Sequence, residues 1–253
     1  MLILALDTST PSGSVAVLEG NRLMGMVGTD MQETYSSRLF RQLDFLLREL
    51  SLEIKEIDLF AVVAGPGSFT GLRVGLTAVK GWGEVHGRPV AAISGLEAVA
   101  ALAVGPVASG SPEAIHTGEP DRPGDSAGDR SYIAPVMDAR RGQVYGGLYR
   151  RTAAGLVRHG DEVLMTAQEF VRELATRVGA QRVLFASPTP RVLTDALTGS
   201  ALRGCGLEQV AAPLAATVGR LAWLKAQRGE TVDALTLDAN YIRRSDAELL
   251  WKG

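Results

Sequence analysis

The segment from Ala64 to Gly75, Ala-Gly-Pro-Gly-Ser-Phe-Thr-Gly-Leu-Arg-Val-Gly, constrains the fold more than any other part of the chain. It follows the apolar run 59–63, where β-branched and aromatic residues predict a buried strand. In the stretch that begins at Leu72, apolar residues recur at helical spacing. A strand, a glycine turn and a helix in this order aim free backbone N–H groups at an anion. A phosphate-binding loop is therefore the first hypothesis to test.

The spacing of the turn does not fit a phosphate loop. The pattern G-x-x-x-x-G-K-[ST] is missing, and Lys80 comes too late to supply its lysine. Gly65 and Gly67 form Gly-x-Gly, but Thr70 stands where a dinucleotide site needs the third glycine. The simpler interpretation is a tight turn followed by a helix cap, in which Ser68 or Thr70 accepts a first-turn N–H.

Glycines continue down the predicted helix instead of stopping at the turn. Gly71, Gly75, Val79, Gly83 and Gly87 follow one another at intervals of four, so they share one face. An interior glycine costs about 0.5–1 kcal/mol of helix stability relative to alanine, and a second backbone approaching closely would explain several of them. The approaching element could belong to this chain, such as helix 33–50, or to another subunit. The pattern leaves both possibilities open.

Charge does not indicate a nucleic-acid-binding protein. The formal net charge is -2, whereas such proteins usually present a basic face. Arginine pairs occur at 140–141, 150–151 and 243–244, but pairs of this kind are typical of solvated surface.

Localisation is predicted from what the chain lacks. Cys205 is the single cysteine, which excludes an intramolecular disulfide and a thiolate metal cage. The apolar start at residues 1–6 meets Asp7 at once and has no basic segment before it, so it does not resemble a signal peptide. No stretch approaches the roughly 20 apolar residues of a membrane span. We expect a cytoplasmic protein without membrane contact.

The first half of the chain predicts a mixed sheet with crossover helices. Three strands joined by tight turns come first, and strands and helices then alternate. The predicted strands are 2–6, 14–18, 22–27, 59–64 and 89–93, and the predicted helices are 33–50, 69–85 and 95–104. Tyr35, Leu39, Leu43, Leu46, Leu47 and Leu50 form the apolar stripe of the first helix.

The second half repeats the plan after a break. Residues 105–130 are dense in Gly, Pro, Ser and Asp and predict a loop or linker without regular structure. The predicted strands that follow are 132–138, 143–149, 156–159 and 183–186; the predicted helices are 166–178, 192–197 and 212–228. Residues 241–246 are expected to be extended.

Two halves of this kind are the plan of the actin-like ATPase (ribonuclease-H-like) fold, an α/β fold of two lobes, each with a mixed sheet flanked by helices. We expect an N-terminal lobe at 1–104 onto which helix 212–228 packs back, a linker at 105–130, a C-terminal lobe at 131–211 and an extended tail at 229–253. In that fold the two strand-turn-strand hairpins hold nucleotide phosphates.

The corresponding positions here make Asp7, Ser9, Asp138 and Arg140 candidates for a degenerate nucleotide cleft. Asp7 and Asp138 could hold Mg²⁺ with ATP in an ATPase or phosphotransferase, but an aspartate at a strand end is more often a structural cap. The three histidines are scattered and none are paired at i, i+4, so we predict no metal site. A G-x-S-x-G nucleophile elbow is also missing.

Four segments resemble the TsaB (YeaZ) family. They are Ile3–Ser9, Gly65–Gly75, Val136–Tyr145 (Val-Met-Asp-Ala-Arg-Arg-Gly-Gln-Val-Tyr) and Tyr241–Glu248, and they follow the family's order over nearly the whole chain except the loop 105–130. The second is a specific signature.

The resemblance implies an actin-like accessory subunit for bacterial tRNA threonylcarbamoyladenosine synthesis, with no catalysis of its own. Its partners would be the TsaD catalytic subunit, the TsaE ATPase, a second copy when alone, and tRNA through the complex. TsaD carries metal-binding histidines in an H-x-x-x-H pattern, whereas Thr34–Leu39 contains none. No tightly bound cofactor is expected, since ATP and Mg²⁺ would act in the partner complex.

The resemblance also implies where the subunits meet. In the family the first two helices pack against their counterparts on TsaD or on a second copy. The residues expected at this interface are Tyr35, Arg38, Leu39, Gln42, Gly71, Leu72, Gly75, Val79 and Trp82.

Overall fold

The computed structural model of the chain describes residues 1–29, 35–103, 132–152, 155–179, 183–240 and 242. Its contacts divide the chain into two compact units. Unit 1 comprises Met1–Ala98 and Ala211–Gly253, and unit 2 comprises Val99–Val210. The predicted loop 105–130 and nearly all of the predicted extended segment 241–246 lie outside the described residues.

Unit 1 is built on a five-stranded sheet in the order β3-β2-β1-β4-β5. The antiparallel part contains β1 (Leu2–Asp7), β2 (Ser14–Glu19) and β3 (Arg22–Gly28). On the other side of β1, β4 (Leu59–Gly65) and β5 (Val90–Ser94) continue the sheet in parallel. This is the mixed sheet that the sequence predicts.

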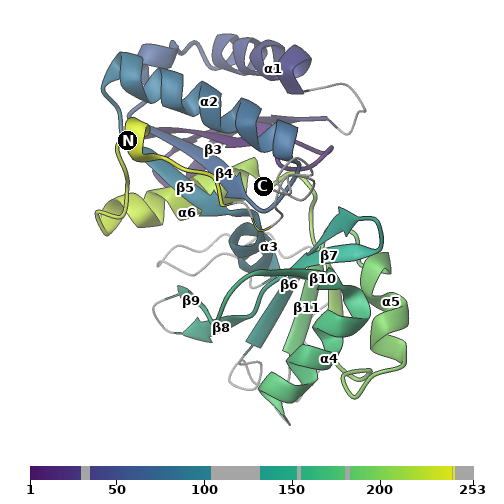
Figure 1. Cartoon of the computed structure of the whole chain (residues 1–253). Coiled ribbons are helices and arrows are strands. Elements are labelled where there is room, and N and C mark those ends of the chain that lie inside the picture. The colour runs from purple at the N-terminus through teal and green to yellow at the C-terminus, as the bar shows by residue number, and fades with distance from the viewer. Residues whose placement is uncertain (30–34, 104–131, 153–154, 180–182, 241, 243–253) are drawn as a thin grey trace, which may run out of the picture. The chain divides into compact units, whose positions relative to one another are not determined.

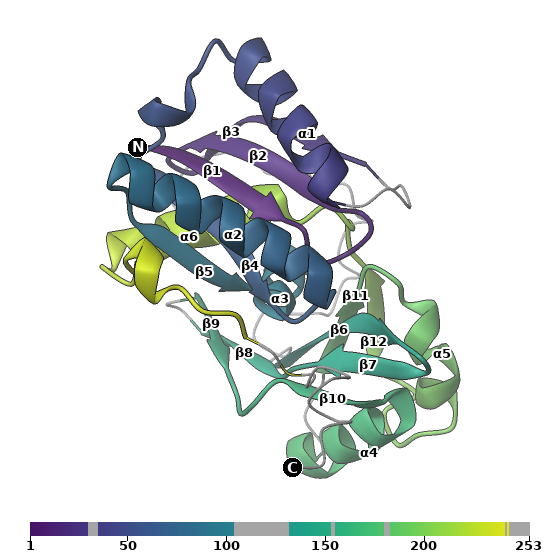
Figure 2. The same cartoon turned by 45° about the horizontal axis from the view of Figure 1, so that its top comes forward.

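Helices cover both faces of this sheet (Figures 1 and 2). On one face lie α1 (Tyr35–Glu49) and α2 (Phe69–His86), and on the opposite face lies α6 (Ala215–Gln227), which contacts β1, β2, β4 and β5. The unit also holds α3 (Gly95–Ala103), which begins in unit 1 and ends in unit 2, and the short 3-10 helices η1 (Ile54–Glu56) and η2 (Ala234–Thr236). α6 thus returns to the N-terminal sheet from the far end of the sequence.

Apolar spacing explains why α1 and α2 lie where they do. Leu39, Leu43, Leu46 and Leu47 of α1 are buried, which confirms these four positions of the predicted stripe, while Leu50 is half-buried. The face of α2 turned to the sheet consists of Gly71, Leu72, Gly75, Leu76, Val79 and Gly83. The helix ends at Gly87, whose φ of 60° is the left-handed conformation that glycine adopts without strain.

Unit 2 repeats the strand order around a second sheet, β10-β7-β6-β11-β12. Its strands are β6 (Tyr132–Arg140), β7 (Gln143–Gly146), β10 (Val163–Thr166), β11 (Val183–Ser187) and β12 (Gly206–Gln209), and a side hairpin is formed by β8 (Tyr149–Thr152) and β9 (Gly155–Arg158). Its helices are α4 (Ala167–Val178) and α5 (Arg191–Thr198). Thr166 caps α4 by accepting the Glu169 N–H, as predicted.

One predicted strand of unit 2 is wrong. Residues 143–149 form two strands, because β7 pairs with β6 and β10 whereas β8 pairs with β6 near its start and with β9. The chain leaves the sheet at Gly147 and Leu148 between them. The four-residue strands β10 and β12 were not predicted.

Both units therefore have the actin-like, ribonuclease-H-like α/β plan of a mixed sheet flanked by helices. Within the described ranges, no helix is both long and apolar enough to cross a membrane.

Candidate functional site

The carboxyl end of β1 carries a buried carboxylate. Asp7 is fully buried, and its Oδ1 accepts hydrogen bonds from the Ser9 backbone N–H at 2.9 Å and the Ser9 hydroxyl at 2.6 Å. Its Oδ2 is buried without a well-formed hydrogen bond to any described residue. Burial raises the pKa of Asp7 to about 6, although the bonds from Ser9 and the nearby Leu214 amide act in the opposite direction. The structure thus brings Asp7 and Ser9 together as a closed contact within unit 1.

The glycine turn lies directly over this strand end. The Ser68 N–H donates to the Ser9 carbonyl at 2.8 Å, and the Ser68 hydroxyl accepts the Gly71 N–H at 3.3 Å. Ser68 is therefore the helix cap that the sequence allowed as one of two candidates. The Thr8 hydroxyl donates to the Gly71 carbonyl at 2.8 Å, which ties the loop after β1 to the first turn of α2.

Close approach to Thr8 explains the glycines of α2. A Cβ at Gly71 would overlap the Thr8 carbonyl oxygen, and a Cβ at Gly75 would overlap the Thr8 hydroxyl. Farther along, a Cβ at Gly83 would stand 2.8 Å from the Ala234 Cβ. The approaching elements are therefore the loop after β1 and η2 of the same unit, neither helix 33–50 nor another subunit.

Three amides at the turn and the start of α2 are already engaged and are not open to an anion. The amides of Ser68, Gly71 and Leu72 all donate within unit 1, the last to the Ser68 carbonyl at 2.8 Å. A Cβ at Gly65 would overlap the Asn240 carbonyl oxygen, and the Asn240 N–H donates to the Ala64 carbonyl at 2.8 Å. The chain itself occupies the space over the turn.

Most residues predicted at the subunit interface lie inside unit 1, which is a correction. Gly71, Leu72, Gly75 and Val79 of α2, and Arg38, Leu39 and Gln42 of α1, are buried in unit 1 and face its interior. Trp82 is half-buried, and the structure places only the backbone of Tyr35, at the start of α1. The physical reason is that apolar spacing and glycines mark whichever face is covered, and here the chain's own sheet covers it.

The buried polar residues of α1 form hydrogen bonds within unit 1. The Arg38 guanidinium donates to the Pro11 carbonyl at 2.6 Å and to the Thr29 hydroxyl at 3.2 Å. The Gln42 amide donates to the same hydroxyl at 2.9 Å. These bonds fix α1 to the loop after β1 and to the end of β3.

An aromatic surface lies on the outer side of the two helices. Phe40 and Phe45 of α1 are 57% and 56% exposed. Phe40 meets Trp82 of α2 edge to face with ring centroids 6.3 Å apart, and Trp82 meets the buried Phe60 at 5.8 Å. We call Phe40 and Trp82 the α1–α2 surface; Phe45, five residues along α1 from Phe40, lies on another side of the helix. Phe40 and Phe45 were not predicted as site residues, although their positions off the apolar stripe of α1 were a usable signal.

The second candidate pair lies in unit 2, at the turn between β6 and β7. Asp138 and Arg140 are exposed, and the Asp138 Oδ1 accepts the Arg140 N–H at 2.7 Å. Arg140 and Arg141 have φ values of 61° and 55°, followed by Gly142 at 73°. Asp138 therefore acts as a cap of its own turn. Among the described side chains, no group of three or more His, Cys, Asp or Glu is arranged to hold a metal ion.

Comparison with known proteins gives a match to a family model and matches to individual relatives. Residues 17–116 match the family described as TsaD, tRNA N6-adenosine threonylcarbamoyltransferase. The tRNA threonylcarbamoyladenosine biosynthesis protein TsaB of Bacillus subtilis is 27% identical over 99% of this chain and 98% of its own length. The TsaB of Haemophilus influenzae is also 27% identical, over 100% of this chain and 96% of its own length.

A solved structure agrees with these relatives. YeaZ from Pseudomonas aeruginosa superposes with a TM-score of 0.73 at 25% identity, covering 95% of this chain and 99% of that one. Full-length similarity in sequence and in fold thus leads to one group. Over its full length the chain is similar in sequence and in fold to the TsaB (YeaZ) group of tRNA threonylcarbamoyladenosine biosynthesis proteins.

Proposed function

We propose that this chain is a non-catalytic scaffold subunit of the bacterial tRNA threonylcarbamoyladenosine synthase. In this role it binds and activates a TsaD catalytic subunit, which transfers threonylcarbamoyl to the adenosine beside the anticodon of ANN-decoding tRNAs. TsaE is the expected ATPase partner, and the free chain pairs with a second copy. The observation that carries the proposal is the α1–α2 surface, within a segment that matches the TsaD family.

The match to TsaD supports pairing through these helices. Residues 17–116 include α1 and α2 complete. Two chains that present similar helix pairs can meet about an approximate two-fold axis, where each offers the same patch to the other. The same reasoning covers a homodimer, in which the axis is a true two-fold.

The chemistry of the α1–α2 surface supports a protein partner. Exposed aromatic side chains are the residues that most often contribute large shares of binding energy in protein interfaces. Trp82 rests on the buried Phe60, so this part of the surface is held by the core. A rigid aromatic anchor loses little conformational entropy when a partner covers it.

The enclosure of Asp7 supports a non-catalytic role over the alternative, an actin-fold ATPase or phosphotransferase that uses Asp7 and Asp138 with Mg-ATP. One oxygen of Asp7 is engaged by Ser9, and Asn240 covers the glycine turn that follows β4. Calorimetry with Mg-ATP on the isolated chain separates the two functions. Micromolar binding and turnover, both lost in Asp7→Asn, would favour the enzyme.

The pairing is tested by titration with TsaD from the same organism. Phe40→Glu places a charge on the α1–α2 surface and should weaken the heterodimer by about tenfold to a hundredfold while leaving the fold intact. Leu207→Glu is the matched control, because Leu207 is an exposed apolar residue of unit 2. Equal affinities for both variants would reject the surface. The whole proposal fails if the wild-type chain forms no complex and cells without it keep the modified nucleoside.

A further inference from the structure

Positive charge is concentrated in one part of unit 2. Residues 132–210 contain ten arginines and no lysine against seven acidic residues, a formal net charge of +3 in a chain whose total is -2. Between Ala139 and Gly160 there are five arginines and one histidine without any Asp or Glu. A local field of this sign attracts polyanions even when the whole chain is slightly acidic.

The hairpin of β8 and β9 carries much of this charge away from the sheet. β6 pairs with β8 only at Tyr132 and Ile133, whereas β8 and β9 pair with each other from Tyr149 to Arg158. Figures 1 and 2 show the two strands leaving the side of the main sheet as a narrow arm. We call residues 149–152 and 155–158 the arm.

The arm presents arginines on both of its faces. In the register of β8 and β9, Arg158 lies opposite Tyr149, so Arg151 and Arg158 share one face, while Arg150 lies on the other. All three arginines are exposed, and in the described part of the chain none of them forms an ion pair. Arginine binds phosphate through two parallel N–H groups, so unpaired arginines on a narrow ribbon suit a phosphate backbone.

Two rings stand at the base of the arm. Tyr132 packs on the core of unit 2, and its ring centroid lies 5.5 Å from that of His159, with the planes inclined by 58°. His159 is exposed, and its backbone is fixed because its N–H donates to the Leu148 carbonyl at 2.7 Å and its carbonyl accepts from Arg177 at 2.9 Å. Arg150 is the cross-strand neighbour of Tyr132. An exposed ring on a fixed backbone, beside arginines, is a stacking surface for an unpaired base.

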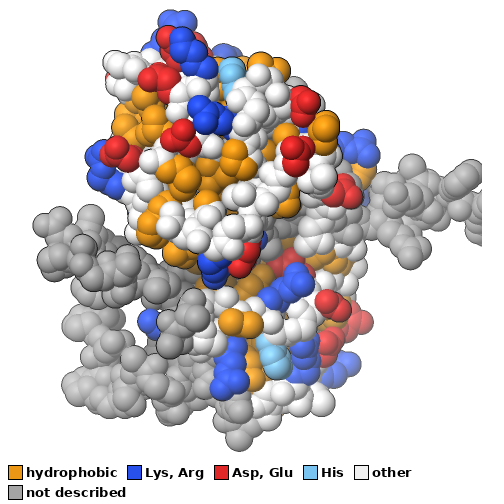
Figure 3. Space-filling view, turned by 90° about the vertical axis from the view of Figure 1, so that its left-hand side faces the viewer, with side chains coloured by type: hydrophobic (Ala, Val, Ile, Leu, Met, Phe, Trp, Pro, Cys, Tyr) orange, Lys and Arg blue, Asp and Glu red, His pale blue; other side chains and the backbone are white. Residues whose placement is uncertain are grey.

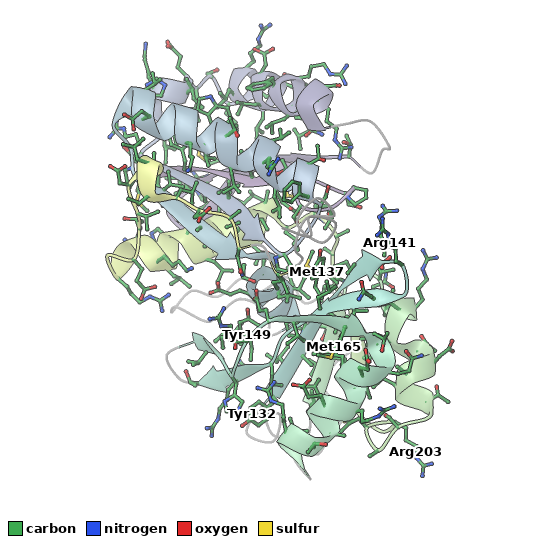
Figure 4. All side chains as sticks on the ribbon, in the orientation of Figure 1. Tyr132, Met137, Arg141, Tyr149, Met165 and Arg203 are labelled. Atoms are coloured by element: carbon green, nitrogen blue, oxygen red, sulfur yellow. The ribbon has the colours of Figure 1, made fainter. Side chains whose placement is uncertain are left out.

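The pictures agree with this grouping. Figure 3 shows basic side chains around a histidine on one face of the molecule, with apolar atoms beside it. In Figure 4 Tyr132 lies at one side of unit 2 and Arg203 at the opposite side, which gives a control region of the same charge.

We propose that the arm and its base, Arg150, Arg151, Arg158, Tyr132 and His159, form a direct RNA-binding surface. The arginines contact phosphates, and His159, supported by Tyr132, stacks on one unpaired base. The RNA expected there is the tRNA substrate of the complex, so this inference rests on the proposed function, to which it adds direct contact by this subunit.

Fluorescence anisotropy with an unmodified tRNA transcript tests the surface, on the full chain and on its complex with TsaD. Replacing Arg150, Arg151 and Arg158 together by alanine should weaken tRNA binding. It should also reduce the magnitude of the negative slope of log K against log salt concentration by about 2–3, because each lost phosphate contact removes about 0.7–0.9 from that magnitude. The control with Arg172, Arg191 and Arg203 replaced removes the same charge from other exposed positions of unit 2 and should leave the slope near wild type.

The ring is tested separately. His159→Ala should weaken binding by about fivefold or more, whereas His159→Phe, which keeps a stacking face, should restore most of the affinity. Equal slopes for the two triple variants, or no tRNA binding by either wild-type sample, would overturn the proposal.

TsaD titrations of the same variants distinguish this inference from the proposed function. The arm variants should pair with TsaD like the wild type. Loss of pairing would show that the arm is a protein interface, which rejects RNA binding there. If wild type binds tRNA through the arm but never pairs with TsaD, the proposed function fails and the RNA surface stands.

Discussion

The two units place an aspartate at corresponding strand ends and treat it in opposite ways. Asp7, at the end of β1, is fully buried and bonded to Ser9, while Asp138, near the end of β6, is exposed and caps its own turn. The strand orders around β1 and β6 match, so the difference does not come from the sheets. It comes from what lies over each strand end.

In unit 1 the glycine turn and α2 cover the loop after β1, because Gly71 and Gly75 let the helix backbone reach Thr8. In unit 2 the turn between β6 and β7 keeps exposed residues. A strand ending in aspartate therefore does not define a nucleotide site by itself. The packing of the following helix decides whether the carboxylate stays open to a ligand.

The largest expected effect comes from adding one methyl group beneath α2. Gly75→Ala should lower the free energy of unfolding of unit 1 by about 3 kcal/mol or more, since its Cβ would overlap the Thr8 hydroxyl and buried backbone must shift. Tryptophan fluorescence during urea denaturation follows this unit, because the described tryptophans, Trp82 and Trp223, belong to it.

Gly81→Ala is the matched control on the same helix. A Cβ there meets nothing within 4 Å, so alanine should stabilise unit 1 by about 0.5–1 kcal/mol through helix propensity. If Gly75→Ala and Gly81→Ala shift the urea denaturation midpoint by the same amount, the close approach of α2 to Thr8 is not what buries Asp7.

The next effect concerns the buried acid. The pKa of Asp7 is raised from its usual 3.8 to about 6, so the folded state holds this proton more tightly than the unfolded state. Its contribution to stability is complete below about pH 4 and is lost as the pH rises through 6. The unfolding free energy of the wild type minus that of the Asp7→Asn variant should therefore increase by up to about 3 kcal/mol as the pH falls from 7.5 to 4.

Asp138→Asn provides the comparison in unit 2. Asp138 is exposed, so this substitution should change the unfolding free energy by no more than about 0.5 kcal/mol at any of these pH values. Circular dichroism at both ends of the range is sufficient. A flat difference curve for Asp7→Asn would mean that the carboxylate is solvated in the folded protein.

The apolar periodicity of the sequence predicted the helices and strands well, but it did not predict which segments pack against them. The leucine stripe of α1 and the glycine stripe of α2 identify covered faces, because burial selects those residues. Nothing in the spacing of Gly71 and Gly75 says that the covering element is the loop at Thr8, since that contact depends on how distant segments pack. The interface residues chosen from these stripes were buried for the same reason.

Short and exposed elements escaped prediction for a different reason. β12 is exposed at all four positions, so its sequence shows no apolar alternation. The predicted strand 143–149 is divided at Gly147 and Leu148, and only the pairing of β7 and β8 with different neighbours reveals this break. Phe40 was not predicted because it belongs to a helix whose apolar residues were assigned to the core. Its exposure depends on how α1 is rotated about its axis.

The smallest expected effect tests how open the turn between β6 and β7 is. Arg140 has a φ of 61°, a left-handed conformation that asparagine tolerates better than arginine. Arg140→Asn should therefore stabilise unit 2 by about 0.5 kcal/mol, as measured by calorimetry. Arg150→Asn, at an extended position of β8, should cost a few tenths of a kcal/mol because asparagine disfavours strands. If Arg140→Asn also lowers the unfolding free energy of unit 2, contacts hold the Arg140 side chain in place. This turn would then resemble the covered loop after β1.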